Sequence, residues 1–215
     1  MKTNYYYFLL ITVIFGPALS LHAQDKKILT DLDGKKSNDR MTAAPAKGGK
    51  ASTFDMKAHT DSLDQLHKKS EELTGMAQKM RGDAKGKTGE VKSLLISEAG
   101  NLEKQSQMVQ IAASELSARI SNHKFNENKT SIKNYVTKTG EENVPVYTKN
   151  LIYDSEKVMR LAKEMREEAN AQPNLASKLG TMGNAEEQET LALSKQVEAL
   201  TQLERASQNA ISSGR

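Results

Sequence analysis

The sequence VKSLLISEAGNLEKQSQMVQIAASELSARI, residues 91–120, carries the most regular pattern in the chain. Apolar or small residues recur at alternating steps of four and three, and Glu, Lys, Asn and Gln fill most positions between them. Large and small members alternate along this stripe: Leu95, Ala99, Leu102, Ser106, Val109, Ala113, Leu116 and Ile120. Since the side chains at a contact set the distance between helix axes, the pattern predicts a close neighbouring helix.

Helical periodicity of the same kind extends on both sides of this stretch. We expect four helices, at about 54–81, 89–123, 150–171 and 184–212. The first has the stripe Met56, His59, Leu63, Leu66, Ser70, Leu73, Ala77 and Met80. Three glycines, at 82, 86 and 89, favour a break after this helix, although the four-three spacing also continues across the gap, as it would in one continuous helix. A second break is expected over 175–183, with Asn184 as the next N-cap.

Residues 124–149 lose this spacing and are interpreted as an irregular insert. Asn128, Gly140 and Pro145 interrupt the segment, and residues 131–137 and 144–147 have the composition of a small β-hairpin. A connection of this length is unusual inside a compact domain. The insert is therefore expected either to carry function or to lack order.

The N-terminal residues predict export. Lys2 precedes an apolar run from Tyr5 to Phe15, and small residues follow, so we expect a signal peptide over 1–23 with cleavage near Ala23. An uncleaved anchor is the alternative, although the run is short for a bilayer. Residues 24–53 combine seven basic and four acidic residues with few large apolar ones, which predicts a disordered linker.

Composition excludes several classes of protein. The chain has no cysteine, and therefore no disulfide framework, lipid-anchoring cysteine or thiol nucleophile. Residues 24–215 hold 30 basic and 27 acidic side chains, a balance too even for a nucleic-acid-binding domain. A low aromatic content of 5% suits a helical core of Leu, Ala, Val and Met.

No motif predicts a catalytic, cofactor or metal site. His59 and His67 are eight residues apart and do not match metal-ligand spacing on a helix. The segment from Gly82 to Thr88 has one residue too few for a phosphate-binding loop and follows a helix instead of a strand. Glutamates near Lys163 and Arg166 are interpreted as a solvated helix face. We therefore expect a protein that is not an enzyme.

The aromatic residues after position 53 supply the candidate interaction surface. If the first helix turns back at 82–89, all five are expected at one end of the bundle: Phe54, Phe125, Tyr135, Tyr147 and Tyr153. Such a cluster either caps the core or binds a partner, because tyrosine is favoured as an interface anchor.

The sequence thus predicts an all-α protein, an up-down-up-down four-helix bundle with a disordered N-terminal tether. A long antiparallel coiled-coil hairpin is the alternative. The expected function is that of an exported, non-enzymatic structural or interaction protein of the bacterial cell envelope. It would act through helix–helix contacts with a protein partner or a second copy. A helical carrier of a lipid or small molecule and a membrane-active amphipathic protein are the alternatives. No nucleic acid is expected as a partner, and membrane contact is possible but not required.

Overall fold

A computed structural model describes residues 54–213, with side chains up to 209. Four α-helices make up this part of the chain: α2 (Met56–Ala84), α3 (Gly89–Thr139), α4 (Val146–Ala171) and α5 (Leu175–Ser213). The predicted all-α, up-down-up-down bundle is confirmed. The predicted signal peptide and linker lie outside the described residues.

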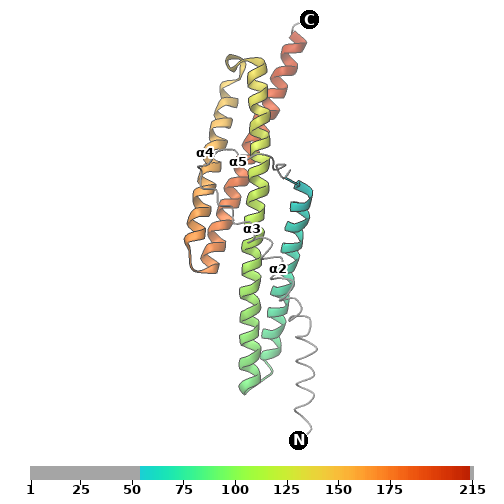
Figure 1. The fold of residues 1–215 in the computed structure, drawn as a ribbon, viewed down its shortest axis with the longest axis vertical. Helices are drawn as coiled ribbons and strands as arrows, with labels where there is room; N and C mark the ends of the chain where they lie inside the picture. The colour runs from blue at the N-terminus through green and yellow to red at the C-terminus, as the bar shows by residue number, and fades with distance from the viewer. Residues whose placement is uncertain (1–53, 214–215) are drawn as a thin grey trace, which may run out of the picture. The chain divides into compact units, whose positions relative to one another are not determined.

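The bundle is built on α3, the longest helix (Figure 1). Helix α2 runs antiparallel along its N-terminal half, with Ser70 hydrogen-bonded to Ser106 and Phe54 stacked on His123. Helices α4 and α5 lie along the other half. Close backbone approach, with Cα atoms within 8 Å, joins α2 to α3, α3 to α5, and α5 to α4.

The α2–α3 contact follows the predicted stripes. Every member of the 95–120 stripe and of the α2 stripe is buried or half-buried, and Ala77 and Ala99 are completely covered. The predicted break is also present, because α2 ends at Ala84 and α3 begins at Gly89. Gly89 has a φ of 63°, a backbone conformation that glycine adopts without steric cost. The α2 N-cap is Asp55, whose carboxylate accepts from the Ala58 N–H.

The prediction of an irregular insert at 124–149 is wrong for most of its length. Helix α3 continues to Thr139, and a 3₁₀ turn (Glu141–Asn143) leads into α4, with no β-hairpin. A second stripe explains the continuation, because its residues are all buried or half-buried: Ile111, Ser114, Ala118, Ser121, Phe125, Asn128, Ile132, Tyr135 and Thr139. It is separate from the first stripe and faces α4 and α5, where Phe125 packs with Met159 and Ala192.

The predicted break at 175–183 is also wrong. Helix α5 begins at Leu175, and Asn174 caps it by accepting from the N–H groups of Ala176 and Ser177. Helix continuation is favoured because Met182 and Ala185 start a buried stripe. That stripe continues through Glu189, Ala192, Gln196, Ala199 and Leu203, again in steps of three and four.

Thr130→Pro tests the helical state of residues 124–139. The side chain of Thr130 is exposed and its hydroxyl bonds only to the Asn126 carbonyl. Proline in a helix interior costs about 3 kcal/mol or more, so chemical denaturation should show a loss of that size. Thr130→Ala is the matched control and should be close to neutral. Equal stability of the two variants would contradict a continuous α3.

Candidate functional site

Exposed apolar side chains occur on both helix pairs, and slightly more of them lie on α4 and α5. Among the described residues, six of the eleven large hydrophobic side chains that are exposed belong to these two helices: Val146, Tyr147, Tyr153, Leu161, Leu191 and Val197. A contiguous apolar patch on a soluble protein is a recognised mark of an interaction site. Their arrangement therefore locates the candidate surface.

Polar contacts between α4 and α5 join one exposed face of each helix. The Tyr147 hydroxyl donates to Glu198 at 2.5 Å, and Lys195 pairs with Asp154 at 3.4 Å. Tyr147 and Asp154 are seven residues apart on α4, and Lys195 and Glu198 are three apart on α5. Each pair therefore shares one helix face.

The same two faces continue to exposed leucines. Leu161 is seven residues beyond Asp154, and Leu191 is four before Lys195, so each leucine lies on the face that carries the polar contacts. Because α4 and α5 are antiparallel, the two leucines lie toward the same end of this helix pair. They are 46% and 43% exposed. These two faces border the seam where α4 packs on α5, and we use the name α4–α5 groove for the six residues along it: Tyr147, Asp154, Leu161, Leu191, Lys195 and Glu198.

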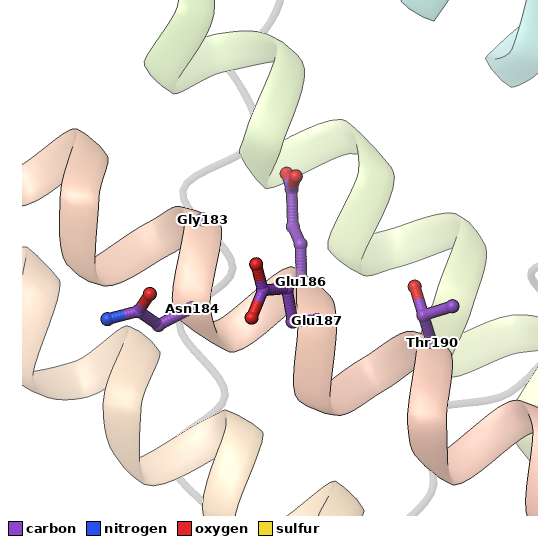
Figure 2. A pocket seen from close by; sticks show the side chains of 5 residues that line it. All are labelled: Gly183, Asn184, Glu186, Glu187 and Thr190. Carbon is purple, nitrogen blue, oxygen red and sulfur yellow. The ribbon is translucent and has the colours of Figure 1, made fainter.

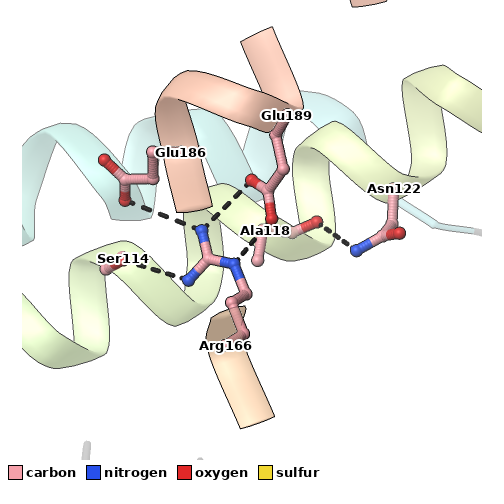
Figure 3. Close-up of polar contacts among 6 residues, drawn as sticks. All are labelled: Ser114, Ala118, Asn122, Arg166, Glu186 and Glu189. Carbon is pink, nitrogen blue, oxygen red and sulfur yellow. Dashed lines mark hydrogen bonds and ion pairs between the residues drawn. The ribbon is translucent and has the colours of Figure 1, made fainter. Parts of the chain in front are cut away.

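A buried ion pair holds the groove's two helices against α3. The Arg166 guanidinium donates two hydrogen bonds to Glu189, at 2.6 and 3.1 Å, and a third to the Ser114 hydroxyl (Figure 3). The Arg166 side chain is 12% exposed and that of Glu189 1%. The charged residues around Arg166 in the sequence suggested a solvated face, but the Arg166 side chain itself is not part of one. Because a bidentate pair forms two parallel hydrogen bonds, it fixes the relative orientation of the two side chains and is also stronger than a single bond.

Two open grooves also occur in the described residues. One is a shallow surface of α5 lined by Gly183, Asn184, Glu186, Glu187 and Thr190 (Figure 2). The other, of about 340 Å³, lies where the start of α5 meets α2 and α3, and polar side chains such as Thr74, Ser106 and Gln110 line it. At its edge Arg81 bonds Glu103 through both oxygens and lowers the pKa of that carboxyl.

The five predicted aromatic residues do not form one surface. Phe54 stacks between His59 and His123, with ring centroids 4.2 and 4.1 Å away, and Phe125 is buried against Met159. Tyr135 is half-buried on the core cluster that contains Ile132 and Leu151. Only Tyr147 and Tyr153 are largely exposed. The single cluster is absent because α3 extends about 24 Å beyond His123, which separates the residues along its axis.

Sequence reasoning missed most of the groove. On spacing alone Leu161 falls with Leu151 and Val158 on the apolar face expected to be buried, and the sequence pattern gives Leu191 and Glu198 no distinct role. The available signal was the seven-residue spacing of Tyr147, Asp154 and Leu161, which marks one helix face.

Comparison with known proteins gives no relative. No family model, curated protein or solved structure matches the chain. Within residues 54–213, no cluster of three or more His, Asp or Glu side chains is arranged to hold a metal ion. No helix in this range is both long and apolar enough to span a bilayer.

Arg166→Ala tests the buried ion pair. Removing the guanidinium leaves the Glu189 carboxylate buried without its partner, so thermal or chemical unfolding should show a loss of about 3–5 kcal/mol. Arg160→Ala is the control on the same helix, because Arg160 and Glu164 are 3.9 Å apart and well exposed; it should cost less than about 1 kcal/mol. Similar losses in both variants would contradict a specific role for Arg166.

Tyr147 should titrate above the ordinary tyrosine range. Its hydrogen bond to the Glu198 carboxylate raises the pKa of the phenol from the usual 10.0. A raised pKa means that the bond contributes stability below pH 10 and is lost as the pH rises through the folded-state pKa. An NMR titration of the tyrosine rings should show Tyr147 shifting back toward 10 in Glu198→Gln. Glu187→Gln, at a residue that precedes Glu198 on α5 and does not bond Tyr147, should leave the pKa of Tyr147 unchanged.

Proposed function

We propose that the protein is an exported, non-enzymatic interaction protein of the bacterial cell envelope, which binds a helix of a protein partner in the α4–α5 groove. The observation that carries this proposal is the pair of exposed leucines, Leu161 and Leu191, on facing stripes of two antiparallel helices. An amphipathic helix binds such a groove by placing its apolar side chains at i, i+3, i+4 and i+7. The export part rests on the sequence of residues 1–23.

The groove has the chemistry of a protein interface. Leucine and tyrosine side chains form its apolar part, while Asp154, Lys195 and Glu198 provide charges at one end. Exposed charges contribute to the rate and the specificity of association more than to affinity. Tyr147 is already held by Glu198, so its ring loses little freedom when a partner covers it.

The packing of the helices favours this function over a carrier. Alanines at 99, 162, 185, 192 and 199 are completely covered at the helix contacts. Small side chains at a contact allow a short distance between helix axes. Closely spaced axes favour a filled core over an internal apolar cavity, which supports a protein that acts through its surface.

Leu161→Ser together with Leu191→Ser tests the groove. These exposed side chains contribute little to folding, so circular dichroism and the melting temperature should stay near those of the unchanged chain. Binding should fall at least tenfold, because two apolar anchors are lost at about 1.5–3 kcal/mol for each fully buried side chain. Sedimentation of the purified chain measures binding to a second copy. Crosslinking in intact envelopes measures binding to another protein.

The control is Val197→Ser, because Val197 is 55% exposed on α5 but lies six residues from Leu191, outside the groove stripe. A photo-crosslinking residue at position 161 should give a product that the same residue at 197 does not. Products that are identical from both positions, or unchanged binding by the double variant, would overturn the proposal.

A further inference from the structure

The turn between α2 and α3 combines lysines with exposed apolar side chains. Three lysines are exposed: Lys85, Lys87 and Lys92. Val91, just before Lys92, is 44% exposed, and Leu94, just after it, is 49% exposed. We call these five residues the turn patch. The fold does not need Val91 and Leu94 beside this interhelical turn, because Ala84, Leu95 and Ala99 form the α2–α3 contact there.

Tertiary structure leaves this end of the hairpin uncovered by α5. The groove where α5 begins brings Ala176 and Leu179 close to α3 at Glu103 to Gln107. Helix α5 starts at Leu175, so it does not reach the first turns of α3. On α3, Val91 and Leu94 lie about 60° apart around the helix axis on one side of the half-buried Leu95, and Lys92 lies on its other side. The apolar pair and the lysines thus share the uncovered end of the hairpin.

The lysines of the patch form no ion pairs with other described residues, and the turn as a whole has a small positive charge. Residues 83–94 contain three lysines and two acidic residues, Asp83 and Glu90. No carboxylate in residues 54–209 forms an ion pair with any of the three lysines; the ion pairs of this region join Arg81 to Glu103 instead. Such lysines attract an anionic surface, and their methylene stems remain compatible with an apolar one.

We propose that the turn patch docks on the surface of an anionic phospholipid bilayer. Val91 and Leu94 enter the boundary between headgroups and acyl chains, while Lys85, Lys87 and Lys92 contact lipid phosphates. A lysine near an anionic leaflet changes affinity by about fivefold, so three give on the order of a hundredfold. This contact is distinct from the α4–α5 groove and leaves that groove open to a protein partner.

A single tryptophan provides a local test in the full-length chain, which has none of its own. Leu94→Trp is titrated with vesicles of mixed phosphatidylglycerol and phosphatidylcholine, and with phosphatidylcholine alone. We expect a blue shift of emission and quenching by lipids brominated in the acyl chain, with the mixed vesicles only. Val197→Trp, on α5, is the matched control and should show neither effect, even if another part of the chain binds the vesicles.

The charge contribution is measured in the same background. Replacing Lys85, Lys87 and Lys92 by glutamine should weaken vesicle binding on the order of a hundredfold, and raising the salt concentration should weaken binding of the Leu94→Trp chain. Circular dichroism shows that each variant is folded. Unchanged Leu94→Trp emission, an equal response to neutral vesicles, or a response to polyglutamate but not to vesicles would overturn the proposal.

Discussion

The use of two faces of α3 is the constraint on which the rest of the structure depends. One stripe, from Leu95 to Ile120, packs on α2, and the other, from Ile111 to Thr139, packs on α4 and α5. The stripes overlap for about ten residues, so α3 is covered on two sides at its middle and on one side toward each end. This arrangement places α2 and the α4–α5 pair along different halves of a single helix (Figure 1).

Polar groups buried in these contacts fix how the helices align. Ser70 and Ser106 bond each other between α2 and α3, and Arg166 joins Glu189 on α5 to Ser114 on α3. Large and small residues repeat at heptad spacing along the 95–120 stripe, so a slip of one heptad would bring residues of similar size into contact. A slip would leave these groups without partners, at a cost of about 1–3 kcal/mol for a neutral group and more for a charged one. The polar contacts thus select one register.

The two proposed surfaces belong to different helix pairs and have different chemistry. The α4–α5 groove has leucines with charges of both signs, which suits a helix of a protein partner. The turn patch combines apolar side chains with three lysines that form no ion pair within the described part of the chain, which suits an anionic lipid surface. In both places the apolar residues lie beside a heptad stripe and not within it, so folding does not bury them.

Local periodicity in the sequence determined the helices, their alternating direction and the α2–α3 contact, because a stripe at four-three spacing has to be covered by another helix. The periodicity was insufficient at 124–139 and 175–183, where Asn128 and the expected N-cap at Asn184 suggested interruption. There, burial of Phe125, Ile132 and Met182 against other helices outweighs a local cost of about 1 kcal/mol per glycine. Only the tertiary structure decided which apolar residues remain exposed, since Leu161 matches a core pattern until the neighbours of its face are known.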